Sequence, residues 1–224
     1  HKPGVGGSNP PLAAKKMLAL KKNFQKYFKS IGYFLFKILY GKIEGIISPE
    51  NGEGISIDLV KKSDKFLYKI YKVENGRLYT DRVNDTAIIK NNKIVEGPSF
   101  QFRTINSQIV NTNVKENLVL SNGTPKLKKK IEGQVLSLLT GGGGNENYWH
   151  WMFDVLPRLS ICESIINLDL IDFFLVPDNR KKFQIETLEI LKIPKKKQIS
   201  SIKFRHILTK NLYITSHPVV LSDN

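Results

Sequence analysis

The sequence is poor in cysteine, with Cys162 alone among 224 residues. A single thiol excludes an intrachain disulfide, and with it the class of small secreted domains that disulfides hold together. A reducing cytoplasm therefore fits this chain better than secretion. Cys162 lies in an apolar helical pattern, which predicts a small buried side chain rather than a reactive thiol.

Long hydrophobic runs are also lacking. The best candidate, Ile31 to Tyr40, covers ten residues and contains Lys37, whereas a membrane-spanning helix needs about 20 apolar residues. No small-residue cleavage site follows it, so it does not resemble a secretory signal. We expect a cytoplasmic protein, and contact with the inner face of the membrane would be peripheral.

Acidic residues are few relative to basic ones: 20 Asp and Glu against 35 Lys and Arg give a formal net charge of +15. Such a chain attracts phosphates, nucleic acid, anionic membranes or acidic sugars. A lysine-rich composition is also typical of AT-rich genomes, and this reading stays open beside the functional one. We expect no nucleic-acid partner, because the lysines are dispersed and no RRM, helix-turn-helix or zinc-finger pattern occurs.

Metal-ligand spacing is absent as well. The four histidines stand apart, with no HxH or HExxH pattern and no cysteine partner: His1, His150, His206 and His217. No DxD-type acidic pair occurs, and a GxSxG nucleophile motif is missing. We therefore expect neither a metal nor another bound cofactor.

The first fifty residues divide into two parts. Residues 1–16 begin with His and are rich in Gly and Pro, which predicts a non-native or disordered leader and makes Met17 the expected start. Residues 17–50 hold a basic amphipathic pattern that predicts a helix over 17–47. Such a helix either lies on an anionic membrane surface or packs on its own domain with a solvated lysine face.

Two further segments follow. Residues 54–125 are β-rich, with strands expected at 55–60, 66–73, 86–90 and 117–121 and turns at 74–76, 91–92 and 96–98. Residues 126–224 alternate strand and helix, which is the pattern of a Rossmann-like α/β fold with helices on the faces of a parallel sheet. Its expected elements are strands at 134–140 and 171–177, helices at 148–167 and 183–191, and short strands at 199–202, 206–208 and 212–215.

The most informative stretch runs from Thr140 to Glu163. Four glycines leave a strand and open a helix on which one polar row follows the spacing i, i+3, i+7, i+11: Asn147, His150, Asp154 and Arg158. On this row Asp154 can orient His150, and Arg158 can neutralise Asp154 or hold an anion. An apolar row faces the sheet, formed by Met152, Val155, Leu156 and Leu159, and Pro157 is expected to kink the helix.

Each of these features has a second interpretation. A His–Asp pair at helical spacing is commonly a structural ion pair. Trp149 and Trp151 flank His150 and could be core residues, or they could stack on the apolar face of a sugar. The glycine run either presents backbone N–H groups to an anion, with Gly142 and Gly143 at its centre, or serves as flexible spacing.

The segment NYWHWMFDVLPRL resembles the hallmark of glycosyltransferase family 61. The matching positions are Asn147, Tyr148, His150, Trp151, Asp154, Leu156, Pro157, Arg158 and Leu159. This combination is far more specific than any single pair within it. The resemblance extends from about residue 76 to the end of the chain and includes 174–179 and 186–194, whereas residues 1–50 add nothing to it.

The resemblance implies an inverting transferase that moves a sugar from a nucleotide-activated donor to a glycan or lipid-linked acceptor. It also implies two Rossmann-like halves of the GT-B type, no bound metal, and a role in capsule, lipopolysaccharide or other bacterial surface glycan synthesis. This chain matches the N-terminal, acceptor-side half, so we expect a truncated enzyme without its donor half. The expected catalytic residues are His150 and Asp154, and the expected substrate-binding residues are Asn147, Tyr148, Trp151, Arg158, Gly142 and Gly143.

The alternative function is that of a non-catalytic, basic module that binds a glycan or a membrane surface.

Overall fold

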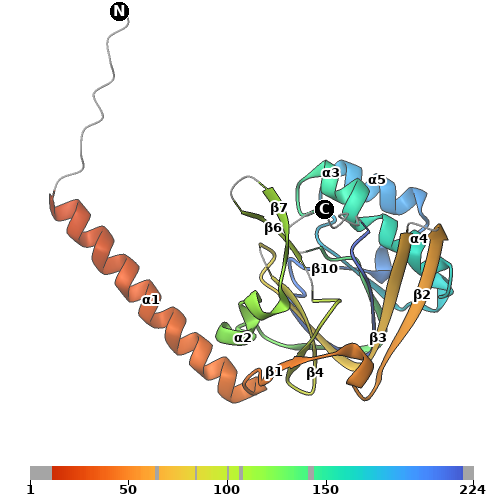
Figure 1. Ribbon diagram of the computed structural model, residues 1–224. Coiled ribbons are helices and arrows are strands. Elements are labelled where there is room, and N and C mark those ends of the chain that lie inside the picture. The colour runs from red at the N-terminus through yellow and green to blue at the C-terminus, as the bar shows by residue number, and fades with distance from the viewer. Residues whose placement is uncertain are drawn as a thin grey trace, which may run out of the picture.

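The computed structural model describes residues 12–218, apart from 64–65, 84, 100, 106–107 and 141–143. Its elements in chain order are α1 (Leu12–Tyr40), β1 (Gly45–Ile47), β2 (Ile55–Ser63), β3 (Phe66–Thr80), β4 (Thr86–Lys90), β5 (Lys93–Val95), β6 (Gln101–Ile105), β7 (Gln108–Thr112), α2 (Val119–Asn122), β8 (Lys129–Ser137), α3 (Tyr148–His150), α4 (Pro157–Glu163), β9 (Phe173–Val176), α5 (Lys182–Ile190), β10 (Gln198–Ser200) and β11 (His206–Thr215). A π-helical turn, Trp151–Val155, links α3 to α4. Figure 1 shows a rounded body from which α1 projects.

A nine-stranded mixed sheet organises the body, in the order β1-β5-β4-β3-β11-β8-β9-β10, with β2 added on β3. The β8 strand pairs in parallel with β11 and β9, and β9 pairs in parallel with β10. The β3 strand runs antiparallel to β11, and β6 and β7 form a separate hairpin. The fold is therefore mixed α/β, and its β8–β9–β10 part has the strand–helix–strand order of a Rossmann-like unit.

The two segments expected from the sequence, 54–125 and 126–224, share this sheet. The register of β3 on β11 runs from Ile70 opposite Thr215 to Tyr79 opposite His206. One hydrophobic core consequently includes Val73 and Leu78 of the first segment with Val135 and Leu175 of the second. The β-rich segment is thus continuous with the Rossmann-like segment.

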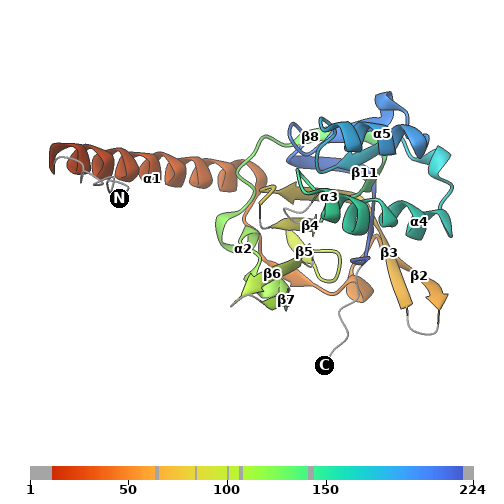
Figure 2. The ribbon, with the colours of Figure 1, turned by 90° about the horizontal axis from the view of Figure 1, so that it is seen from above.

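The helices that follow β8 and β9 lie on one face of the sheet (Figures 1 and 2). Side chains alternate along a strand, and Leu136 and Leu138 accordingly pack with Trp151 of the π turn and Leu188 of α5. Val135 and Leu139 belong to the core on the other face. The residues packed on that second core come from loops and strands rather than from helices, namely Ile47, Ile55, Phe173 and Phe204. Of the two faces, only one carries α3, α4 and α5.

The helix expected over 17–47 begins at Leu12, within the segment expected to be a disordered leader, and it ends earlier than predicted. It stops at Tyr40, because Gly41 adopts a left-handed φ of 82° and the chain then turns into β1. Ile46 and Ile47 pair with Ile94 and Val95 of β5. The apolar residues that follow Gly41 fit the spacing of a helix by coincidence. Their pairing with β5 makes them a strand instead.

Three smaller expectations were wrong. Residues 119–122 form α2 instead of a strand, because Asn117 Oδ1 accepts a hydrogen bond from the N–H of Val119 and Gly123 ends the turn at φ 70°. The expected turn at 74–76 lies within β3, and the two short strands expected at 206–208 and 212–215 form the single strand β11. The expected turn at 91–92 is confirmed, with both asparagines at positive φ.

The expected strands and helices of the Rossmann-like segment are present with different bounds: β8 begins at Lys129, and the helix expected over 148–167 is interrupted by the π turn and ends at Glu163. The expected strands at 134–140 and 171–177 correspond to β8 and β9, and the helix at 183–191 corresponds to α5. Cys162 is fully buried in α4, and burial raises the pKa of its thiol to about 12. Among the described residues, no helix has both the length and the apolar character needed to cross a membrane.

Candidate functional site

The candidate site begins where β8 leaves the sheet. Gly142 and Gly143 lie outside the described residues, so the expected anion-binding role of the glycine run stays a prediction. Gly144 is described, at φ 76°, and a Cβ there would come within 2.5 Å of Val155 Cγ2. Only glycine allows this close approach, which brings the loop against the π turn that carries Asp154.

Asn147 starts the helical segment. Its side-chain Oδ1 accepts hydrogen bonds from the N–H groups of Trp149 at 2.9 Å and His150 at 3.3 Å. This is an N-cap, which satisfies two N–H groups that a helix start leaves free. Asn147 therefore sets the position of His150 relative to the end of the glycine loop.

Pro157 explains the π turn. Proline lacks an N–H, and its ring clashes with the carbonyl of the residue four positions earlier, here Phe153. The chain responds with a wider turn, in which the N–H of Leu156 bonds to the carbonyl of Trp151 at 3.1 Å, five residues back. Pro157 then occupies the first position of α4, where no N–H is needed. The expected kink is thus a widened turn located at Asp154.

The His150–Asp154 contact predicted from spacing is present. His150 Nδ1 lies 2.6 Å from Asp154 Oδ2. The carboxylate is only 6% exposed, whereas the imidazole is 40% exposed. With Nδ1–H donating to the buried carboxylate, Nε2 is left as the acceptor nitrogen of a neutral ring.

Arg158 is buried and directs its guanidinium to oxygen atoms of the backbone and of Thr215. Its Nε donates to the carbonyl of Asp154 at 2.8 Å, and its Nη1 donates to the carbonyl and hydroxyl of Thr215 at 3.2 and 3.0 Å. Burial lowers the pKa of Arg158 to about 10, and the negative charge of Asp154 opposes that shift. The positive charge of Arg158 thus offsets the negative charge of Asp154 without a bond to its carboxylate. The hydrogen bonds of Arg158 join α4 to the end of β11.

Sequence reasoning did not find His217. Its Nε2 lies 3.9 Å from Asp154 Oδ1 and 3.1 Å from Thr140 Oγ1. That carboxylate oxygen is buried without a hydrogen-bond partner, so Asp154 lies between two imidazoles. No local spacing could reveal His217, which follows β11; only the pairing of β11 with β8 brings it to this place.

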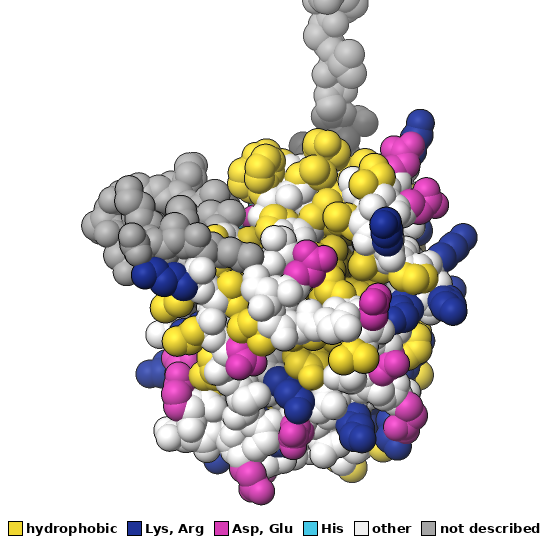
Figure 3. Space-filling model, turned by 90° about the vertical axis from the view of Figure 1, so that its right-hand side faces the viewer, with side chains coloured by type: hydrophobic (Ala, Val, Ile, Leu, Met, Phe, Trp, Pro, Cys, Tyr) yellow, Lys and Arg dark blue, Asp and Glu magenta, His cyan; other side chains and the backbone are white. Residues whose placement is uncertain are grey.

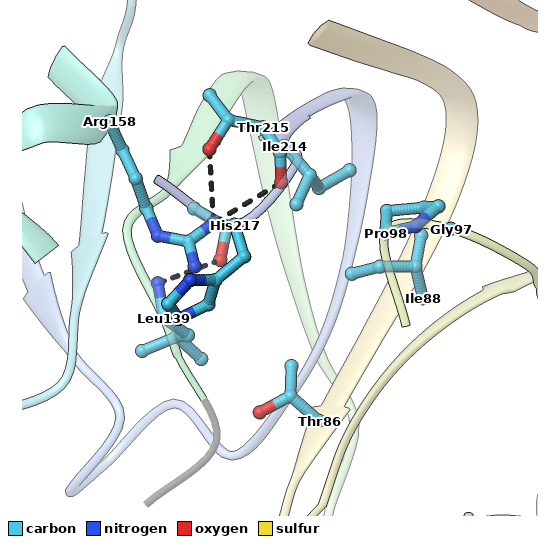
Figure 4. A pocket seen from close by; sticks show the side chains of 10 residues that line it. Thr86, Ile88, Gly97, Pro98, Leu139, Arg158, Ile214, Thr215 and His217 are labelled. Atoms are coloured by element: carbon cyan, nitrogen blue, oxygen red, sulfur yellow. Dashed lines mark hydrogen bonds between the residues drawn. The ribbon is translucent and has the colours of Figure 1, made fainter. Parts of the chain in front are cut away.

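A small cavity lies beside these residues. Figure 4 shows Arg158, Thr215 and His217 on one side of it, with Ile88, Gly97 and Pro98 on the other. Its volume is about 10 Å³, which suits a single water and excludes a sugar ring. The accessible side of this site, among the described residues, is the exposed side of His150.

Trp151 does not contact that exposed side, contrary to expectation. It is fully buried, and its indole N–H donates to Thr187 Oγ1 of α5 at 2.9 Å. Its neighbours are instead exposed: Tyr148, Trp149 and Phe153 each have more than half of their surface accessible. Trp149 packs at 5.0 Å from Phe153 and edge-on to His150 at 5.4 Å between ring centroids. Hydrophobic side chains gather over α3 and α5 in Figure 3.

Within the described part of the chain, no group of three or more His, Cys, Asp or Glu side chains is placed to hold a metal ion. The site is instead a histidine, a buried carboxylate and a buried guanidinium beside exposed aromatic rings. No protein-family model, curated protein or solved structure matches the chain.

Proposed function

We propose that this chain supplies the acceptor-binding part of an inverting glycosyltransferase similar to family 61. The reaction transfers a sugar from a nucleotide sugar to a hydroxyl of a glycan or lipid-linked acceptor during surface polysaccharide synthesis. A GT-B architecture follows from this proposal, with the Rossmann-like unit forming one wall of the cleft and a donor-binding domain forming the other. The reaction would proceed without a metal.

One observation carries the proposal, namely the hydrogen bond between His150 and Asp154. The buried carboxylate fixes the proton on Nδ1, so the partly exposed Nε2 is able to accept a proton. A purely structural pair has no need of an accessible second nitrogen. The pair lies in the segment whose residues resemble the family hallmark.

The chemistry follows from that geometry. As the acceptor oxygen attacks the anomeric carbon, its proton passes to His150 Nε2, and the bond from that carbon to the nucleoside diphosphate breaks. The electron pair of this bond leaves with the diphosphate. The imidazolium that forms on His150 is stabilised by the Asp154 carboxylate, which lies 2.6 Å from Nδ1.

The exposed aromatic rings support a sugar as the ligand. Trp149 and Phe153 stand next to His150 on the same side of the segment. The C–H face of a pyranose packs well on such rings. The sequence suggested a stacking role for both tryptophans; in this proposal Trp149 keeps that role, and the buried Trp151 does not.

The test is a transfer assay on the whole gene product, including any residues encoded after Asn224. Labelled UDP-, GDP- and dTDP-sugars are offered with cell-surface glycan and lipid acceptors. His150→Ala is expected to lower kcat by about 10²–10⁴-fold, because it removes the general base. Asp154→Asn is expected to lower kcat by a smaller factor, because the wrong imidazole tautomer becomes available.

Ile190→Gln is the matched control, since Ile190 is exposed on α5 and distant in sequence from the site; it is expected to retain full turnover. Undiminished turnover in His150→Ala would refute the proposal. If no donor is used and saccharide binding persists but depends on Trp149, the chain is a glycan-binding module instead.

A further inference from the structure

The α1 helix presents an apolar surface that no other described part of the chain covers. Six large side chains on one side of the helix are each more than half exposed: Phe24, Tyr27, Phe28, Phe34, Leu35 and Ile38. We call them the apolar stripe. Figures 1 and 2 both show α1 leaving the body as a rod that meets it only at the C-terminal end.

The contacts at that end fix which side of α1 faces outward. Arg77 Nη1 donates to the carbonyl of Tyr40 at 3.3 Å, and the N–H of Lys128 donates to the Tyr40 hydroxyl at 3.0 Å. Lys37 Nζ, one turn earlier, donates to the carbonyl of Ser121 at 2.7 Å. Residues 37 and 40 thus hold the inner side of the helix, and the stripe lies on the outer side.

The charge of α1 indicates what covers the stripe. The 29-residue helix contains seven lysines and no aspartate or glutamate. Lys22 and Lys26 lie two positions from Phe24 and Phe28, and two residues advance a helix by about 200°, so these lysines are opposite the stripe. Lys16 and Lys21 lie at the edges of the stripe. A second copy of α1 would bring fourteen lysines together without a counter-charge, whereas an anionic surface complements them.

The positive charge continues onto the body at the base of the helix. Leu127 is 71% exposed there, and Lys126, Lys129 and Lys130 around it are exposed as well. This basic segment is joined to α1 through the Lys128–Tyr40 hydrogen bond. The helix and the body therefore offer positive charge beside exposed apolar side chains at the same end of the molecule.

We infer that α1 lies flat on an anionic lipid surface, with the apolar stripe inserted among the headgroups, Lys16 and Lys21 at the level of the lipid phosphates, and the lysines of the opposite side within about one screening length of them. The helix is about 43 Å long at 1.5 Å per residue, and interfacial helices of this kind bury their apolar face about 5–10 Å deep. Its aromatic side chains suit the boundary between headgroup and hydrocarbon. This inference does not depend on the proposed sugar transfer.

The test is flotation of the intact chain with vesicles of phosphatidylcholine alone or of phosphatidylcholine with phosphatidylglycerol. The chain is expected to float with the anionic vesicles and to bind neutral ones far more weakly. Raising the salt is expected to release it, because the screening length shortens from about 10 Å at 0.1 M to about 3 Å at 1 M. Equal binding to both vesicles, unaffected by salt, would overturn the charge argument.

Two sets of variants separate the stripe from the lysines. Phe28→Gln with Leu35→Gln is expected to weaken binding about 10-fold or more, since each change removes a large apolar insertion. Lys21→Gln, Lys22→Gln and Lys26→Gln together are expected to weaken binding about 100-fold, at about 1 kcal/mol per lysine near an anionic surface. Glutamine is a good helix former, so circular dichroism is expected to show α1 unchanged.

Matched controls change exposed residues of the body in the same way. Leu170→Gln with Ile190→Gln, and Lys195→Gln with Lys196→Gln and Lys203→Gln, are expected to keep full vesicle binding. An equal loss in these controls would overturn the inference. So would light scattering that shows a dimer dispersed by Phe28→Gln with Leu35→Gln, because a second copy would then cover the stripe.

Discussion

His206 is a buried histidine that must stay neutral in the folded protein. Arg77 Nε donates to His206 Nε2 at 3.3 Å, and His206 Nδ1 lies 3.0 Å from the carbonyl of Lys126. Burial lowers the pKa of His206 to about 4, and the charges of Arg77 and Lys128 act in the same direction. A proton on Nε2 would displace the arginine and place two cations side by side.

This histidine predicts acid sensitivity. Between its unfolded pKa of about 6.5 and its folded pKa of about 4, the unfolded chain binds the extra proton, so stability falls as the pH falls. Urea unfolding at pH 7.5 and pH 5 is expected to differ by about 2 kcal/mol from this group alone. The difference should shrink by that amount in His206→Asn, which keeps a donor for the Lys126 carbonyl and cannot titrate. An unchanged difference in the variant would assign the acid sensitivity to other groups.

At the scale of elements, the sequence predicts those helices, strands and turns whose formation depends on neighbouring residues. The presence of β8 and β9, the turn at Asn91 and Asn92, and the His150–Asp154 row depend on residues close in the chain and were predicted, although the bounds of both strands differ from those expected. The end of α1 and the nature of residues 119–122 were not, because a left-handed Gly41 and the hydrogen bonds of Asn117 outweigh apolar spacing.

Trp151 illustrates the limit of that approach. Its position in the sequence suggested a substrate contact, but Pro157 widens the turn and Trp151 faces α5. A helical wheel assumes regular turns, so it cannot show where a π turn points its side chains. The buried indole of Trp151 bonds to Thr187, which a local pattern does not connect with it.

Thr187 offers a test of this packing. Its hydroxyl accepts from the Trp151 indole at 2.9 Å and donates to the carbonyl of Phe183 at 2.7 Å. Thr187→Val keeps the shape but leaves the buried indole N–H without a partner, so it is expected to lower the free energy of unfolding by about 1–3 kcal/mol. Thr187→Ser keeps the hydroxyl and is expected to cost less than Thr187→Val in the same urea titration. Equal losses would mean that the methyl group, rather than the hydrogen bond, matters.

At the scale of the whole molecule, one side chain connects the two segments that the sequence separates. Arg82, in the connection from β3 to β4, donates to Ser201 Oγ at 3.0 Å and to Asn145 Oδ1 at 3.1 Å. Its Nη2 lies 3.5 Å from Asp178 Oδ2. These partners follow β8, β9 and β10, so Arg82 spans the ends of three parallel strands. Contacts between residues this far apart in the chain, like that of His217 with Asp154, are invisible to sequence patterns.

The contact of Arg82 with Asp178 is expected to contribute to the free energy of unfolding. The Asp178 side chain is fully buried, and burial raises the pKa of its carboxyl. Hydrogen bonds from Arg180 and from the N–H of Asn179 lower that pKa by more, so the net pKa lies below the ordinary value. Removing one partner of a buried ion pair costs about 3–5 kcal/mol. Because Arg180 stays with Asp178 in an Arg82→Met variant, we expect a smaller loss, of about 2 kcal/mol.

Urea unfolding of Arg82→Met and Arg180→Met compares the two partners of Asp178. Arg180 is largely exposed, and its side-chain hydrogen bonds go to Asp178 in the same loop, so solvent can replace part of what it supplies and its loss is expected to cost less than that of Arg82. Asn145 also donates to the Arg82 carbonyl at 2.7 Å and lies two residues before Asn147. Arg82→Met should therefore speed hydrogen exchange at the N–H groups of Trp149 and His150, while Arg180→Met should not. Equal exchange in both variants would mean that the loop before α3 is held by its own turn, without help from the β3–β4 connection.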